Sequence, residues 1–409
     1  MRMKLKKSSQ LMLVSAAGLL AAGLISACGT LTTDFVFVTS AKAAGTNNYG
    51  EIDIFEINSE SGHMRQIPAS PVPSGGRNPV AEAVSTDNST LFVVNKDDNT
   101  LVQFVIGSDG KLYPYSTVNT PGISPIALAV SSSMLFVVDT YQPLPTCTSA
   151  APCSGSISVL PLVAATSSAP LGLGAPVSNT ANGSTYWPLT LPSAPTDVIV
   201  PTAVTFTVTG TGNTAVTTLF VAAYDATTST KTGYIFAYTV GTSGALTPVA
   251  NSPFAAGSQP FSLSADGSGK YLYAADYTAN QVLGFSISAT GALSALSGSP
   301  YVAGNAPAAI IADPSYNFVY VANSTDSNVT AYSASSGVLT KVATYATGLN
   351  PMAIGIDPST HHFLYTANFL GNSISDWQLS TTDGTLMVAQ GSPASTNANP
   401  TAVAAVPHK

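Results

Sequence analysis

The stretch Pro307–Asn350 reads PAAIIADPSYNFVYVANSTDSNVTAYSASSGVLTKVATYATGLN, and Pro351 then begins the same pattern again. Short apolar or alternating segments are separated by clusters of Asp, Asn, Ser, Gly and Pro, which is typical of strands joined by tight turns. The predicted strands are Ala308–Ala312, Phe318–Ala322, Asn328–Ser333 and Val338–Tyr345. A four-stranded antiparallel unit of ~44 residues has the length and content of a propeller blade.

The same unit recurs along the chain, each time opened by a proline. The opening prolines are Pro79, Pro125, Pro195, Pro260, Pro307, Pro351 and Pro400. Phe35–Val38 resembles a second strand rather than a first, whereas Pro400–Val406 is a first strand with no second. We therefore predict an all-β, seven-bladed β-propeller over residues 35–409, with four-stranded antiparallel blades and a ring closed by the C-terminal strand.

Three stretches lengthen the repeat. Residues 140–155 extend the connection between the second and third strands of blade three, and residues 161–194 surround its outer strand and exit. Residues 205–217 lengthen the first turn of blade four. In a propeller, the loops between second and third strands and those between blades share one face, which conventionally binds the ligand. The position of the insertions on blades three and four suggests a lid over that face.

Composition excludes some partners. Charged residues make up only 8% of the 409 residues, and the formal net charge is −7. Nucleic-acid binding needs clustered Lys and Arg, so we expect no nucleic-acid partner. No Gly-rich phosphate loop and no G-x-S-x-G motif is present, and we expect no cofactor.

The first residues predict export. Arg2, Lys4, Lys6 and Lys7 precede the apolar run Leu11–Ala22, and small residues then lead to Cys28. This pattern resembles the lipobox of bacterial lipoproteins, in which the cysteine is lipidated and the signal peptide, here 1–27, is removed. We expect a lipid anchor on Cys28, a short tether over 28–34 and a place in the bacterial cell envelope. A plain signal peptide with an incidental cysteine is the alternative.

Two further cysteines, Cys147 and Cys153, flank a short loop. In an exported protein such a pair is expected to form a disulfide. No soft or imidazole ligand lies nearby in the sequence, so we predict no metal site there.

Four copies of one part of the repeat resemble a known family: LFVVNKDDNTL, LYAADYTANQV, VYVANSTDSNV and LYTANFLGNSI. With them the chain resembles the seven-bladed lactonase-like propellers, which include 6-phosphogluconolactonases and carboxymuconate cyclases and merge with YVTN-repeat proteins. The resemblance implies hydrolysis of a small sugar-acid lactone in the axial channel. It also implies Arg and His after the blade-opening prolines, where this chain has Val80-Ala81, Ile126-Ala127, Phe261-Ser262, Ala308-Ala309 and Met352-Ala353.

Few residues could perform lactone hydrolysis, which needs a base and donors for the developing oxyanion. Glu82 is an acid within an apolar first strand, and Asp197 holds a comparable place in blade four. We predict both as catalytic candidates, with Arg77, Asn78 and Gln259 as substrate-binding candidates. The alternative is that channel-lining polar groups only hold water.

Three other groups of polar residues are expected to have structural roles, not catalytic or binding ones. Lys96-Asp97-Asp98 could hold a hard cation but is expected to be a solvated turn, because DxDxDG-like spacing is missing. The recurring strand-ending Asn and Asp residues are expected to cap turns. His361-His362 is interpreted as a surface pair.

The sequence is therefore compatible with two functions. The first is a lactonase acting on a small-molecule lactone. The second is a non-catalytic envelope propeller, which binds a glycan or protein and is favoured by the export signal and the shortage of Arg, Lys and His. In either case we expect a monomer.

Overall fold

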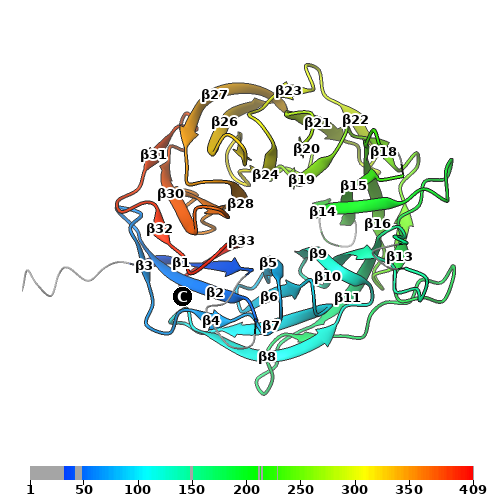
Figure 1. Ribbon diagram of the computed structural model, residues 1–409, viewed down its shortest axis with the longest axis horizontal. Coiled ribbons are helices and arrows are strands. Elements are labelled where there is room, and N and C mark those ends of the chain that lie inside the picture. The colour runs from blue at the N-terminus through cyan, green and yellow to red at the C-terminus, as the bar shows by residue number, and fades with distance from the viewer. Residues whose placement is uncertain are drawn as a thin grey trace, which may run out of the picture.

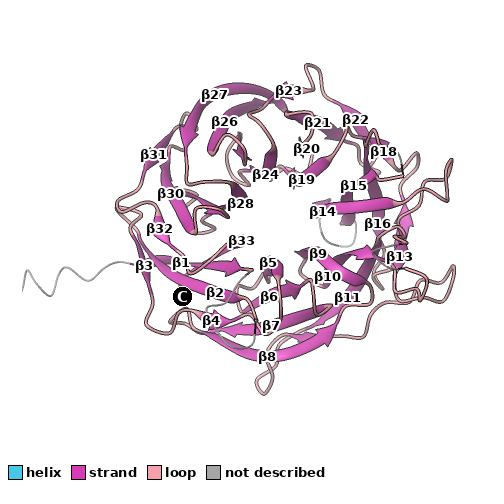
Figure 2. Ribbon diagram, in the orientation of Figure 1, coloured by secondary structure: helices cyan, strands magenta, loops and turns pink. Residues whose placement is uncertain are grey.

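The computed structural model describes residues 32–408, apart from 42–47, 148–150, 211, 213–214 and 228. The expected signal peptide, Cys28 and the beginning of the tether therefore lie outside the described residues. The described strands form seven antiparallel sheets that stand around a central axis like blades (Figure 1). Strands and loops make up this ring (Figure 2), and no described segment forms a helix long and apolar enough to cross a membrane. The predicted seven-bladed propeller is confirmed.

Each blade runs from an innermost strand at the axis to one or two outer strands at the rim. In blade order, the innermost strands are β33 (Pro400–Pro407), β5 (Pro79–Val84), β9 (Ile123–Val130), β14 (Ile199–Thr209), β19 (Pro260–Ala265), β24 (Pro307–Ala312) and β28 (Pro351–Ile356). The second strands are β1 (Thr32–Ser40), β6 (Thr90–Asn95), β10 (Met134–Tyr141), β15 (Val216–Asp225), β20 (Tyr271–Asp276), β25 (Phe318–Asn323) and β29 (Phe363–Asn368).

The third strands are β2 (Glu51–Asn58), β7 (Thr100–Ile106), β11 (Ser156–Val163), β16 (Thr232–Val240), β21 (Gln281–Ile287), β26 (Asn328–Ser335) and β30 (Ser373–Leu379). Blades two and six end in one long outer strand, β8 (Leu112–Asn119) and β27 (Val338–Ala346). The other blades split theirs into two short strands: β3 (Met64–Gln66) and β4 (Val72–Pro73), β12 (Gly172–Leu173) and β13 (Trp187–Pro188), β17 (Leu246–Pro248) and β18 (Phe254–Ala255), β22 (Leu293–Ala295) and β23 (Tyr301–Val302), β31 (Leu386–Val388) and β32 (Ala394–Ser395).

The core lies between neighbouring blades. Strands β6, β25 and β29 are buried along their whole length, because both faces of a blade are covered by the blades beside it. Tyr320 of blade six and Trp377 of blade seven, for example, belong to one cluster that fills the space between those blades. A strand that is covered on both faces needs an almost continuous apolar run, which is why the second strands were the clearest feature of the sequence.

The C-terminal strand closes the ring. β33 pairs antiparallel with β1, with Val406 opposite Phe35 and Ala404 opposite Phe37 (Figure 1). The first and last strands of the described chain thus share one blade, as predicted. The pairing leaves no gap in the ring, so no long unpaired edge is exposed at the junction.

Blade four corrects the sequence interpretation in two respects. Its opening proline is Pro201 rather than Pro195, because Pro201 lies opposite Ala223 just before the bulge that marks every innermost strand. Moreover, most of 205–217 is not a longer turn. Thr209 pairs with Val216, so this stretch continues both strands of the hairpin.

Blade three carries the other two insertions where the sequence placed them. The connection between β10 and β11 contains the predicted disulfide, with the Cα atoms of Cys147 and Cys153 5.4 Å apart. The stretch 161–194 contains β12 and β13, both of which pair with β11.

Candidate functional site

A β-bulge at the start of each innermost strand builds the entrance of the axial channel. In every blade a paired proline lies at the start of the strand or, in β9 and β14, two residues into it, and the next residue is left without a partner on the second strand. Bulges of this kind redirect side chains, here towards the axis. The seven bulge residues are Val80, Ile126, Thr202, Phe261, Ala308, Met352 and Thr401.

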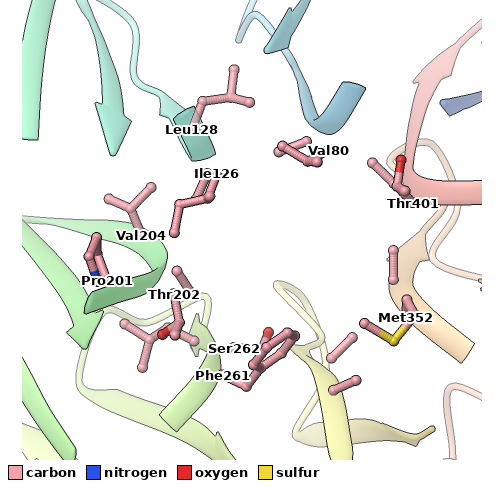
Figure 3. Close-up of a pocket in the computed structure, with 18 of the residues that line it drawn as sticks. Val80, Ile126, Leu128, Pro201, Thr202, Val204, Phe261, Ser262, Met352 and Thr401 are labelled. Carbon is pink, nitrogen blue, oxygen red and sulfur yellow. The ribbon is translucent and has the colours of Figure 1, made fainter. Parts of the chain in front are cut away.

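All seven bulge residues line one axial cavity of about 540 Å³ (Figure 3). Two further rings lie below them. The second ring is Ala81, Ala127, Ala203, Ser262, Ala309, Ala353 and Ala402. The third ring is Glu82, Leu128, Val204, Leu263, Ile310, Ile354 and Val403. Among these described residues most side chains are apolar, and one, Glu82, carries a carboxyl group.

Glu82 is that carboxyl group, and its environment is unusual for an acid. Its Oε2 accepts a hydrogen bond of 2.5 Å from Oγ1 of Thr39, while Oε1 is buried with no hydrogen-bond partner among the described residues. Burial raises the pKa of Glu82 to about 8, although hydrogen bonds from Thr39 and from the backbone of Ala404 act in the opposite direction. A carboxyl group in an apolar cavity is stabilised in its neutral form, which makes it a stronger base once it ionises.

Ser262 is the hydroxyl of the second ring. Its Oγ accepts a hydrogen bond of 3.2 Å from the backbone N–H of Ile310, which leaves its own hydrogen free to donate. The other ring hydroxyls differ, because Thr202 donates to the carbonyl of Pro260 and Thr401 donates to the carbonyls of Thr39 and Pro79. Ser262 is therefore the ring hydroxyl placed to donate to a ligand.

The mouth of the cavity adds Lys96, Thr140, Tyr224, Gln259 and Phe369. Gln259, a predicted substrate-binding residue, lies here as expected. Its Oε1 accepts hydrogen bonds from Lys231 at 2.9 Å and Thr278 at 2.7 Å. Lys231 also lies 4.6 Å from the centre of the Tyr224 ring. Gln259 is thus part of a preformed polar rim.

Arg77 and Asn78 do not line the cavity. The guanidinium of Arg77 pairs with Asp98, with Nη2 and Oδ1 2.6 Å apart, and Asn78 donates to Asp97. The neighbouring cation holds the pKa of Asp98 below its usual value. The predicted substrate role of this pair is not supported by their placement, because their polar groups already satisfy the turn after β6.

Asp197 is also placed elsewhere. It precedes β14, it is absent from the cavity lining, and its backbone carbonyl accepts a hydrogen bond of 2.9 Å from Ser154. The residue of blade four that corresponds to Glu82 is Val204, because the blade opens at Pro201. The comparison of Asp197 with Glu82 was therefore wrong.

The strand-ending polar residues have structural contacts, and some of them also reach a second segment. Asp276 accepts hydrogen bonds from the backbone N–H groups of Ser258 and Gln259, both at 2.9 Å. Asn323 likewise accepts from Gly304 at 3.0 Å. These two side chains hold the loop that enters their blade, whereas Asp225 caps the turn that follows it by accepting from the backbone N–H of Thr227 at 2.7 Å. Among the described residues, no group of three or more His, Cys, Asp or Glu side chains is arranged to hold a metal ion.

Comparison with known proteins agrees with this architecture. Residues 211–303 and 293–404 match the family described as "Lactonase, 7-bladed beta-propeller". No curated protein sequence matches the chain.

Solved structures share the fold at low identity. The periplasmic gluconolactonase of Pseudomonas aeruginosa aligns with a TM-score of 0.68 and 18% identity, over 92% of this chain and 99% of that one. A candidate 6-phosphogluconolactonase of Bacteroides fragilis gives 0.67 and 19%, over 92% and 99%. Another from Bacteroides uniformis gives 0.68 and 17%, over 92% and 100%.

The fold, the axial cavity and the family match define a class. The chain is a seven-bladed β-propeller, and its residues 211–404 resemble the lactonase family, as its repeats indicated. None of the seven bulge residues is the Arg or His that the resemblance implies.

Proposed function

We propose that the protein hydrolyses a small, uncharged lactone in the axial cavity, with Glu82 as the general base. The observation that carries the proposal is the carboxyl group of Glu82, the one such group among the described lining residues, which lies between mostly apolar rings and has a pKa raised to about 8. A base of this strength suits removal of a proton from water near neutral pH. The cavity volume of about 540 Å³ lies within the usual range for small-molecule sites.

The reaction uses two sides of the channel. β5, which carries Glu82, and β19, which carries Ser262, face each other across the axis (Figure 1). Glu82 takes a proton from water, and the resulting hydroxide attacks the lactone carbonyl. Ser262 donates to the oxygen on which negative charge develops. The ring C–O bond then breaks, and the proton held by Glu82 passes to the alkoxide that leaves.

The substrate is expected to carry no phosphate. Among the described residues that line the cavity, Lys96 is the only Lys or Arg, and the guanidinium of Arg77 is paired with Asp98. A phosphate group is normally held by several cationic or backbone donors. We therefore expect turnover of a neutral sugar-acid lactone, such as glucono-δ-lactone, and none of 6-phosphogluconolactone above its spontaneous rate.

The first experiment compares these two lactones as substrates for the chain without residues 1–28. Acid release is followed by a pH indicator, with the spontaneous rate subtracted. Glu82→Gln is expected to remove turnover of the neutral lactone, whereas the controls Asp197→Asn and Arg77→Gln are expected to retain it. Equal rates for the wild type and Glu82→Gln would contradict the proposal.

A second function is favoured by one observation. Six of the seven positions in the third ring are aliphatic, and the second ring is alanine except at Ser262, which suits passive burial of a ligand. In this alternative the propeller binds an envelope glycan or protein without turnover. A thermal shift with oligosaccharides, and none with lactones, would favour it.

We also propose that the protein is exported and anchored through a lipid on Cys28. The basic leader, apolar run and small residues before this cysteine support the proposal. Cell fractionation tests it: wild-type protein is expected in the membrane fraction and Cys28→Ala is not. If both variants fractionate as soluble exported protein, the alternative of a plain signal peptide is correct.

A further inference from the structure

The face of the propeller where the innermost strands end, opposite the bulge residues, carries a second cluster of reactive groups. The turn between β24 and β25 contributes Asp313 and Ser315, and the turn between β28 and β29 contributes His361. Ser315 Oγ lies 3.2 Å from His361 Nε2. His361 Nδ1 lies 3.4 Å from Asp313 Oδ1. The imidazole therefore lies between a hydroxyl and a carboxylate, with one ring nitrogen facing each.

The side chains become more exposed from Asp313 through His361 to Ser315. Acyl transfer by a serine needs an accessible hydroxyl and a shielded acid, which is this order. The side chain of Asp313 is fully buried, the side chain of His361 is 17% exposed, and Ser315 is exposed. Asp313 Oδ2 and His361 Nδ1 are both buried without a hydrogen bond among the described residues. The carboxylate thus lies on the buried side of the ring, 3.4 Å from Nδ1, while the hydroxyl on the other side is accessible to a substrate. Catalytic hydrogen bonds are often longer than ideal before a substrate binds.

Backbone contacts fix both turns. Asp313 Oδ1 accepts hydrogen bonds from the backbone N–H groups of Ser315 and Tyr316, at 2.8 and 2.9 Å. His361 has a left-handed φ of 56°, and its backbone N–H donates to Asp357 at 3.1 Å. The ring of Tyr316 meets the imidazole edge-on, with the ring centres 6.3 Å apart. The histidine is therefore held by its backbone and by one ring contact.

A cavity of about 430 Å³ opens beside the hydroxyl. Ser315 and Tyr316 form part of its lining, and Lys270 and Asn317 supply side-chain donors on the same lining. The turn of blade five approaches so closely that a Cβ on Gly267 would lie 1.8 Å from the carbonyl oxygen of Pro314. This glycine allows the two turns to pack together and holds the wall of the cavity in place.

We propose that Ser315, His361 and Asp313 form a serine-esterase site for small acyl esters, separate from the axial cavity. Ser315 Oγ attacks the ester carbonyl as its proton passes to His361 Nε2. The bond to the leaving alcohol breaks, and the alcohol departs with that proton. Water then attacks the acyl-serine, again through His361, which releases the acid and restores the Ser315 hydroxyl. Asp313 orients the imidazole and stabilises its charged form.

The neighbouring blade supplies a matched control. Asp357, Pro358 and Ser359 repeat the Asp-Pro-Ser turn of blade six, and Ser359 is also exposed. However, the hydroxyl of Ser359 donates to Asp34, not to a histidine. If an exposed serine after Asp-Pro were sufficient for reactivity, Ser359 would react as readily as Ser315.

The first test is covalent labelling of the full chain with a fluorophosphonate. Intact mass and peptide mapping are expected to show one adduct, on Ser315 and not on Ser359. Ser315→Ala is expected to abolish labelling, and Ser359→Ala to leave it unchanged. His361→Asn, which tolerates the left-handed backbone, is expected to slow labelling by about 100-fold or more. Labelling of Ser359 to the same extent, or none at Ser315, would overturn the proposal.

The second test measures p-nitrophenyl acetate hydrolysis, with the thermal unfolding of each variant as a control for folding. Ser315→Ala and His361→Asn are expected to lose the catalysed rate while unfolding near the wild-type temperature. Ser359→Ala, which removes an exposed serine bonded to Asp34 and not to a histidine, is expected to keep it. If Ser315→Ala unfolds normally and hydrolyses the ester at the wild-type rate, Asp313 only caps its turn and the site is not catalytic.

Discussion

Thr39 of blade one donates a hydrogen bond from its Oγ1 to Oε2 of Glu82 in blade two, across the boundary between the blades. Thr39 lies on β1, the strand that also pairs with the C-terminal strand. The acid of the axial cavity is therefore positioned by the same strand that closes the ring. Closure of the propeller and the chemistry of the cavity are structurally coupled.

Thr39→Val tests this coupling. Thr39 is fully buried and valine has nearly the same shape, so the change removes the hydrogen bond with little change in packing. That bond lowers the pKa of Glu82, so its loss raises the pKa. A hydrogen bond to a charged group contributes about 1.5–3 kcal/mol, which corresponds to about one pH unit or more. We expect the midpoint of the pH–rate profile for lactone hydrolysis to move upward by that amount; an unchanged midpoint would exclude the coupling.

Buried carboxyl groups should make the protein most stable at mildly acidic pH. Burial raises the pKa of Asp53 to about 6, of Asp34, Asp139 and Asp376 to about 7, and of Glu82 to about 8. Between the unfolded pKa, near 4, and these values the folded state binds more protons than the unfolded state. Stability therefore falls as the pH rises, by up to about 1.4 kcal/mol per pH unit for each group.

Thermal unfolding at constant ionic strength checks this dependence. We expect the melting temperature to fall steadily between about pH 5 and 8 and then to level off. Glu82→Gln should flatten the upper part of the curve, since it removes the group with the highest of these pKa values. A melting temperature that rises over this range would show that these carboxyl groups are not buried in their neutral form.

Closure of the ring should carry a large share of the stability. Val406 is 1% exposed and packs in the same cluster as Phe37, Leu91 and Phe104, which joins blades one and two. Val406→Ala removes two buried methyl groups, so we expect a loss of about 1–3 kcal/mol. Val302→Ala on an outer strand, where the valine is 82% exposed, is the control and should change stability by less than about 0.5 kcal/mol. Urea unfolding of both variants measures the difference.

The disulfide should contribute less to the free energy of unfolding than the closing strand does. Cys147 and Cys153 are six residues apart, and loop-closure entropy for such a short loop is about 2 kcal/mol. We expect Cys147→Ser with Cys153→Ser to lower the free energy of unfolding by no more than this amount and to leave lactone turnover unchanged. Thiol titration of the unfolded wild type, with and without reductant, verifies the bond.

The repeats predicted the fold because each blade needs the same apolar runs and turns. The register of blade four was mispredicted, because Pro195 and Pro201 both precede apolar runs and only pairing with β15 distinguishes them. The placement of Asp197 was wrong for the same reason. The channel position of Glu82 was predictable, because an acid within an innermost strand has to face either the axis or the core.

Other parts of the sites depend on contacts between blades, which sequence spacing does not reveal. The pairing of Arg77 with Asp98 and the contact of Thr39 with Glu82 both join distant segments. His361 was interpreted as a surface residue, yet it contacts Asp313 and Ser315 of the preceding blade. The Asp-Pro-Ser turn that recurs in blade seven was a visible signal, but it gave no indication that a histidine from the next blade lies beside it.

Glu82 is proposed to act as a base in the axial cavity. The most direct test is the pH dependence of kcat/KM for glucono-δ-lactone, measured for the wild type and Glu82→Gln with the spontaneous rate subtracted. We expect the wild-type value to rise with pH through a midpoint near 8, where Glu82 ionises, and Glu82→Gln to show no catalysed rate at any pH. A Glu82→Gln profile that matches the wild type would contradict the account.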